Sequence, residues 1–94
     1  MTAYMVQMTI TDAVQYRKYG EAVVPLITKY GGTQIVRRGK IEMLEGRHDG
    51  STMAVFQFPS VDAIHAFWNS PEYGPVKELR RAAAVLNVWA VEGV

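Results

Sequence analysis

Residues 56–80, FQFPSVDAIHAFWNSPEYGPVKELR, contain the pattern that decides the fold. An apolar strand ends at Phe58, and Pro59-Ser60 separates it from an amphipathic helix that extends to about Asn69. Ser70-Pro71-Glu72 then predicts the start of a second helix, because it offers a hydroxyl N-cap, a proline and an acid in the first turn. The stretch therefore predicts a strand followed by two helical segments.

The second helical segment is expected to extend from Pro71 to about Ala84, with an interruption at Gly74-Pro75. A last strand follows, from Leu86 to Val91. The central stretch also gathers most of the large side chains that could line a pocket, together with one cation: Phe56, Phe58, Phe67, Trp68, Tyr73 and Arg80.

Toward the N-terminus, residues 4–10 alternate with a period of two and predict a strand. Thr11 is expected to cap a helix, with Asp12 in its first turn. Pro25 should kink this helix because it removes a backbone donor, and Gly31-Gly32 should end it by supplying a left-handed residue.

Between these halves, residues 33–38 predict a strand, and residues 41–45 continue in the same extended style. Arg38-Gly39-Lys40 is either a tight hairpin or a glycine bulge within one long strand. We favour the bulge, because with the strand at residues 52–58 it gives the order βαββαβ. That order in a single domain of residues 1–94 predicts an α+β, ferredoxin-like antiparallel sheet with its helices on one face.

The second face of such a sheet is bare in a monomer. The alternation predicts that this face is too apolar to be simply wet, and we expect a homodimer that packs sheet against sheet. The residues expected on it are Met5, Gln7, Thr9, Val55, Gln57, Asn87 and Trp89.

The composition excludes several classes of partner. A net charge of +1 predicts no binding to nucleic acid or to an acidic membrane surface, and no apolar run is long enough to span a membrane. The absence of cysteine excludes disulfides and thiolate sites and is compatible with the cytoplasm, the location we expect. His48 and His65 lack a second ligand at metal spacing, so we expect no metal and no cofactor.

Several short motifs recur in an order that resembles the bacterial domain-of-unknown-function family numbered 1330. They are Tyr30-Gly31-Gly32, Arg37 before Gly39, Glu45-Gly46, Phe58-Pro59, Ser70-Pro71-Glu72-Tyr73, Arg80 and Val91-Glu92-Gly93.

The resemblance implies the dimeric α/β-barrel superfamily, in which two ferredoxin-like sheets close into one barrel. It implies no chemistry, because the family has no assigned activity, although superfamily relatives include cofactor-free monooxygenases and isomerases. The sequence departs from the family pattern at Gln57, where a glutamate is common, and in the loop 47–50.

The candidate site is a pocket between the sheet and residues 68–80. We expect Tyr19, Trp68, Tyr73 and Arg80 to line it, with Arg80 meeting an anionic group. Arg37 and Glu45 are further ligand-binding candidates, with a strand-fixing ion pair as the alternative. Ser70 is interpreted as a helix cap rather than a nucleophile, and no catalytic residue is assigned.

Three functions remain open from the sequence. The interpretation we favour is binding of a small aromatic or anionic metabolite between the sheet and the helices. The alternatives are a cofactor-independent monooxygenase or isomerase, and a non-catalytic structural or stress-related module. Whether the chain is an enzyme is not decided by its sequence.

Overall fold

The computed structural model describes all residues except 1, 13–15, 39–40, 49–51 and 82–83, and within this part the chain forms four strands and three helices. The elements are β1 (Ala3–Asp12), α1 (Tyr16–Lys29), β2 (Thr33–Arg37), β3 (Thr52–Phe58), α2 (Val61–Trp68), α3 (Tyr73–Arg81) and β4 (Ala84–Glu92).

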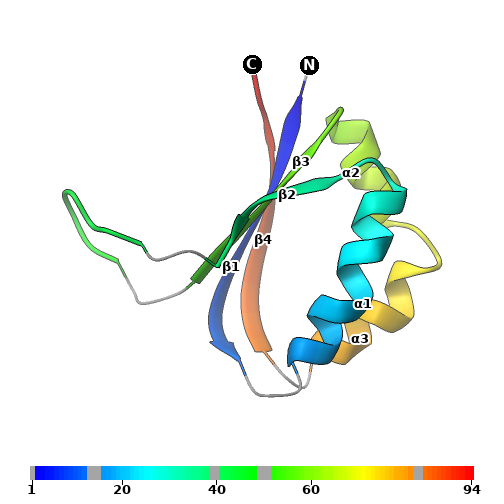
Figure 1. Ribbon diagram of the computed structural model, residues 1–94, viewed down its shortest axis with the longest axis horizontal. Coiled ribbons are helices and arrows are strands. Elements are labelled where there is room, and N and C mark those ends of the chain that lie inside the picture. The colour runs from blue at the N-terminus through cyan, green and yellow to red at the C-terminus, as the bar shows by residue number, and fades with distance from the viewer. Residues whose placement is uncertain (1, 13–15, 39–40, 49–51, 82–83) are drawn as a thin grey trace.

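The strands form one antiparallel sheet in the order β2-β3-β1-β4, and all three helices cover the same face of it (Figure 1). This arrangement is the predicted ferredoxin-like fold, and the predicted order βαββαβ is confirmed with its second helical region divided into α2 and α3. The sheet thus has one helix-covered face and one open face.

The core lies between the helices and the covered face. In β3 every second residue is buried, and Phe56 and Phe58 pack toward the helices. Each apolar side chain of this size contributes about 1.5–3 kcal/mol when it is fully buried. The buried hydrophobic residues are Ala3, Met5, Tyr19, Val23, Leu26, Ile27, Ala54, Phe56, Phe58, Ile64, Phe67 and Tyr73.

The predicted phase of β1 is wrong. Met5 and Gln7 were expected on the open face, but both are buried on the helix-covered face, where Met5 is paired with Phe56 and Ala90. The side chain of Thr9 lies outside those that the structure describes. The alternation indicated the wrong phase, because the open face of β1, with Tyr4, Val6 and Met8, is at least as apolar as its covered face.

The open face carries an apolar row that crosses all four strands. The register places Val36, Val55, Val6 and Trp89 side by side, in the order β2-β3-β1-β4. Trp89 is 49% exposed. The expected open-face positions in β3 and β4, Val55, Gln57, Asn87 and Trp89, are confirmed by this register.

The first helix begins later than predicted. Thr11 and Asp12 still belong to β1, where they pair with Val85 and Ala84 of β4 beyond a bulge. The hydrogen bonds of the sheet thus prevail over the capping signal of Thr11. α1 then contains Pro25 and continues to Lys29.

Gly31-Gly32 ends α1 as predicted, with Gly31 at φ 89° and Gly32 N donating to the Ile27 carbonyl over 2.9 Å. A Cβ on Gly32 would lie 2.8 Å from Phe58 Cζ and would also clash with the Ile27 side chain. Both neighbours are buried in the core, so neither can move without disturbing the packing.

Gly32→Ala is therefore expected to lower the free energy of unfolding by about 1–3 kcal/mol, the usual cost of overpacking. Urea denaturation measures this change. Gly20→Ala is the matched control, because Gly20 lies within α1 and a Cβ added to it would have no neighbouring atom within 4 Å. That control should be neutral or slightly stabilising. Equal urea midpoints for Gly32→Ala and the unchanged protein would contradict the packing described for this corner.

Residues 41–48, hereafter the arm, differ from the prediction. The pairing of β2 with β3 ends at Arg37, and residues 41–45 form no strand but extend away from the sheet (Figure 1). The β2 bulge lies between Gln34 and Val36, whereas the expected Arg38-Gly39-Lys40 bulge includes two residues outside the described part of the chain. The pairing of β2 with β3 ends at Arg37 and Ala54, and in the described part of the chain residues 41–45 are paired with no strand.

The predicted interruption at Gly74-Pro75 is also wrong, because both residues lie in the first turn of α3. The amides of a first turn have no intrahelical acceptor, so proline removes nothing there. None of the described helices is long and apolar enough to cross a membrane.

Candidate functional site

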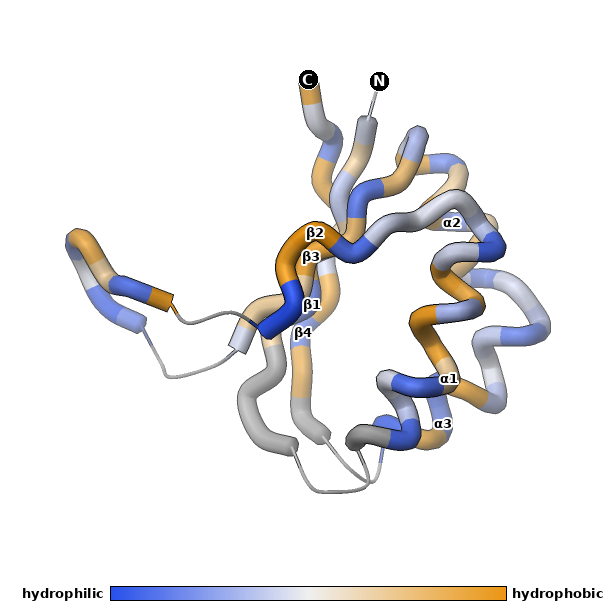
Figure 2. The backbone as a smooth tube through the Cα atoms, viewed as in Figure 1, coloured by the Kyte–Doolittle hydropathy of each residue, from blue (hydrophilic) through white to orange (hydrophobic). Residues whose placement is uncertain are grey.

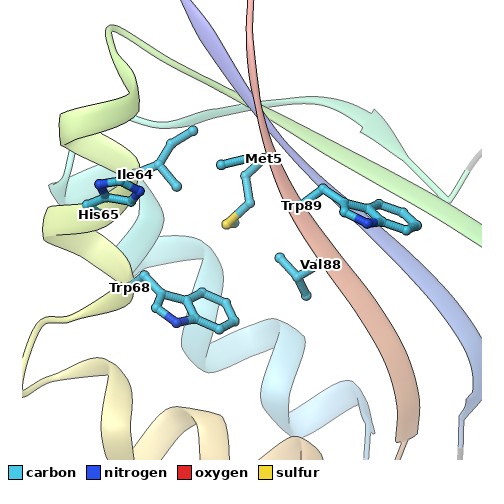
Figure 3. Close-up of a pocket in the computed structure, with 7 residues that line it drawn as sticks. Met5, Ile64, His65, Trp68, Val88 and Trp89 are labelled. Atoms are coloured by element: carbon cyan, nitrogen blue, oxygen red, sulfur yellow. The ribbon is translucent and has the colours of Figure 1, made fainter.

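A cavity of about 290 Å³ lies between α2 and the covered face of β1 and β4. Ile64 and Trp68 of α2 point toward Met5 and Val88 of the sheet across it (Figure 3). The Trp89 ring points away from the cavity, as expected for the alternate position of β4. The lining residues are Met5, Ile64, His65, Trp68, Val88, Trp89 and Ala90, and the surface they offer is mainly apolar.

The local sequence explains this lining. Ile64 and Trp68 are four residues apart and therefore share one face of α2. Met5 reaches the same cavity because it lies on the covered face of β1. His65 borders the cavity from the same helix and is otherwise exposed to solvent.

Trp68 lines this cavity and also contacts two cations of α3. The Lys77 ammonium lies 4.5 Å from the centre of the Trp68 ring, and the Arg80 guanidinium lies 5.8 Å from it. A ring face attracts cations through its quadrupole, by about 0.5–1 kcal/mol for each exposed contact. Trp68 therefore belongs both to the lining of an apolar cavity and to a cluster with two cations, which are not themselves among the lining residues.

Arg80 is held by a pair of buried tyrosines. Its Nε donates to the Tyr73 hydroxyl over 3.4 Å, and the Tyr73 and Tyr19 hydroxyls lie 3.0 Å apart. Both tyrosines are almost completely buried, at 3% for Tyr19 and 1% for Tyr73. The Arg80 guanidinium also lies 5.9 Å from the centre of the Tyr19 ring. These contacts limit the orientations open to Arg80 and leave its two terminal nitrogens for an anion.

Ser70 positions Tyr73 by closing the corner between α2 and α3. The Ser70 hydroxyl donates to the Phe67 carbonyl over 2.8 Å and accepts from the Tyr73 amide over 3.2 Å. This geometry confirms the interpretation of Ser70 as a cap. It also brings the Tyr73 ring within 4.6 Å of the Phe67 ring and 5.2 Å of the Trp68 ring, measured between centres.

A second link fixes the start of α3 to the end of α1. The Lys29 ammonium lies 2.6 Å from one Glu72 carboxylate oxygen, and the Tyr30 hydroxyl donates to the other over 3.0 Å. The hydrogen bond from Lys29 lowers the pKa of Glu72, and the same bond raises the pKa of Lys29. Because both groups are exposed to solvent, the link orients α3 more than it stabilises the fold.

The structure brings four of the six candidate residues together, namely Tyr19, Trp68, Tyr73 and Arg80. Arg37 ends β2, at the edge of the sheet opposite β4, and Glu45 lies in the exposed arm. Both belong to the described part of the chain, and the structure has no ion pair between them.

Of the four residues expected to line the pocket, only Trp68 is among those that line this cavity. Sequence reasoning missed Lys77 and the other lining residues, which are Met5, Ile64, His65, Val88, Trp89 and Ala90. The signal for Lys77 was its position three residues before Arg80, which places both cations on one side of α3. Among the described residues no group of three or more histidine, aspartate or glutamate side chains is arranged to hold a metal ion.

Solved structures with the same fold have diverse descriptions. A protein of unknown function from Rhodopseudomonas palustris, RPA0582, superimposes with a TM-score of 0.75 at 22% identity, covering 99% of this chain and 82% of that chain. SnoaB, a cofactor-independent oxygenase from Streptomyces nogalater, superimposes in its N63A mutant with a TM-score of 0.63 at 13% identity, covering 98% and 92%. The de novo designed protein Foldit4 gives 0.58 at 8% identity, covering 99% and 98%. At these identities the likeness is one of fold alone.

No curated protein matches the sequence. A family model does match, over residues 2–94, which is nearly the whole chain. This chain therefore belongs to the family described as Domain of unknown function (DUF1330).

Proposed function

We propose that this protein binds a small aromatic carboxylate, with the ring in the cavity between α2 and the sheet. The observation that carries the proposal is Trp68, one face of which lines an apolar cavity while its ring contacts Lys77 and Arg80. A ligand with a flat apolar part and one negative charge matches both features. Arg80, oriented by Tyr73, is the group assigned to the carboxylate.

The cavity volume sets the size of the ligand. About 290 Å³ lies at the lower end of the range for small-molecule sites, so we assign a ligand with one ring or two fused rings. Apolar walls from Met5, Ile64 and Val88 supply the hydrophobic part of the binding free energy. A charged hydrogen bond at the rim then discriminates an acid from its neutral analogue.

Titration with benzoate and with benzamide tests this proposal. The two compounds have nearly the same shape, but only benzoate carries a charge, so benzoate is expected to bind more tightly. Trp68 fluorescence reports the binding in a Trp89→Phe background, which removes the second tryptophan. The same comparison is made for acid and amide pairs with one ring and with two fused rings. Equal affinities for the acid and the amide in every pair would contradict the assigned role of the cations.

Oxygenation is the second candidate function. The motivation is the hydrogen-bonded pair of hydroxyls of Tyr19 and Tyr73, of which the Tyr73 ring packs against Trp68 of the cavity lining. The structural likeness to a cofactor-independent oxygenase is one of fold and adds only an analogy. Oxygen consumption with phenolic carboxylates decides between the two: binding without oxygen uptake supports the binding function alone.

We further propose that the open face of the sheet is covered by a second copy of the chain. The apolar row Val36, Val55, Val6 and Trp89 is the support for this assignment, because it is too apolar for a surface that faces water. A two-fold axis lets one such face cover its own equivalent.

A further inference from the structure

The arm carries three exposed apolar side chains on a segment that leaves the body of the protein. Ile41 is 37% exposed, Met43 57% and Leu44 92%. Figure 2 shows hydrophobic colour along this segment, at a distance from the core. In a monomer the burial of these side chains contributes nothing, so their presence indicates an interaction surface.

The direction of the arm shows which surface it adjoins. The helices lie on one side of the sheet, and the arm extends toward the other side, beyond the ends of β2 and β3 (Figure 1). Any body that covers the open face therefore lies beside the arm. The exposed apolar side chains of the arm and the apolar row of the open face therefore lie on the same side of the molecule.

We propose that the arm of each subunit packs against a second copy of the chain and holds it on the open face. This inference rests on the proposed homodimer and adds a contact to it. With two-fold symmetry each arm contacts the partner once, so the dimer contains this contact twice.

The area of the open face supports a role for the arm. Four strands about 4.8 Å apart, with about seven residues of about 3.3 Å each, cover roughly 440 Å² of plane per subunit. Two such faces have a flat footprint of roughly 900 Å², and stable interfaces bury about 1,200–2,000 Å² of accessible surface, so this contact is of ordinary size at most and leaves room for contacts at its margin. Two arms supply additional apolar area at the edge of this contact.

The charge of the arm favours a protein partner over a membrane or a nucleic acid. Its sequence, IEMLEGRH, contains Glu42 and Glu45 but only one arginine, Arg47. An amphipathic membrane-binding segment or a phosphate-binding segment needs an excess of positive charge. A second copy of this nearly neutral chain has no such requirement.

Leu44→Asp tests the inference, with Leu79→Asp as the matched control. Both leucines are exposed, but Leu79 lies on α3, on the helix-covered side of the sheet. Sedimentation over a concentration series is expected to give a dimer Kd that rises about 10- to 100-fold for Leu44→Asp and stays unchanged for Leu79→Asp. Because Leu44 is 92% exposed, the subunit itself should fold as before, as circular dichroism will show.

Thiol reactivity supplies a second measurement. The chain has no cysteine, so Leu44→Cys and Leu79→Cys each introduce a single thiol. The thiol at position 44 should react more slowly with a disulfide reagent as the protein concentration rises through the dimer Kd, whereas the thiol at position 79 should not.

The outcomes separate the two proposals. A dimer of Leu44→Asp with the Kd of the unchanged protein, and with a reactive thiol at position 44, overturns the arm contact and leaves the sheet-to-sheet dimer standing. A monomeric unchanged protein overturns both.

Discussion

Trp89→Glu is expected to convert the homodimer into monomers. Trp89 lies at the β4 end of the apolar row on the open face, and its ring points away from the helices (Figure 3). Loss of a tryptophan that acts as a hot spot of an interface typically costs about 2–4 kcal/mol. Burial of an unpaired carboxylate adds a further desolvation cost. Together these effects should raise the dimer Kd by at least about 100-fold.

Light scattering at micromolar concentration measures this change as a fall in mass from about twice 10.5 kDa to 10.5 kDa. Trp89→Phe retains an aromatic ring and should remain largely dimeric. Leu79→Glu places the same charge on the helix side and should have no effect on the mass. A Trp89→Glu protein that stays dimeric would show that the open face is not the contact.

The order of the elements could be predicted from the sequence because the residues that begin and end the helices act locally. Gly31-Gly32 at the end of α1 and Pro59-Ser60 before α2 act through their own backbone and their near neighbours. The Ser60 side chain accepts from the Ala63 amide, for example, over 3.1 Å. Signals of this kind need no knowledge of the tertiary structure, and they were sufficient for the ferredoxin-like topology.

The phase of β1 could not be obtained in the same way. Tyr4, Val6 and Met8 are at least as apolar as Met5 and Gln7, yet they lie on the open face. The more apolar face of an alternating strand is usually the face that is buried. That inference fails wherever the exposed side is itself apolar, which is the feature that the proposed dimer explains.

The starts of α1 and α3 differ from their predicted positions for a related reason. Thr11 is an acceptable cap and Pro75 an acceptable interruption, as far as sequence alone can tell. Pairing of Asp12 with Ala84 keeps Thr11 in the sheet. The start of α3 at Tyr73 places Pro75 in the first turn, where it is tolerated. Both outcomes depend on contacts between distant parts of the chain.

The candidate site was partly predictable. The seven-residue spacing of Tyr73 and Arg80 places both on one side of a continuous helix, and the structure joins them by a hydrogen bond. The contact between Tyr19 and Tyr73 spans 54 positions and depends on how α1 packs against α3, which no local pattern contains. The cavity walls from β1 were missed because they depend on the phase of that strand.

Arg80→Ala is expected to weaken benzoate binding by about 1.5–3 kcal/mol, the usual range for a hydrogen bond to a charged group. This corresponds to a Kd about 10- to 150-fold higher. Benzamide, which has no charge, should bind with nearly the same affinity as before. The physical reason is that Tyr73 orients the guanidinium at Nε, so that its terminal nitrogens are available to a carboxylate.

Arg81→Ala is the matched control for this prediction. It removes the same charge from the adjacent position of α3, but Arg81 is exposed and pairs with Glu78 over 3.4 Å. Arg80→Lys separates charge from geometry, because lysine keeps the positive charge and loses the planar fork, and it should restore only part of the affinity. Thermal melting of each variant shows whether the Tyr19 and Tyr73 packing survives. Equal benzoate affinities for Arg80→Ala and Arg81→Ala, in proteins that melt alike, would assign the anion to another cation, and Lys77 beside Trp68 would then be the residue to replace.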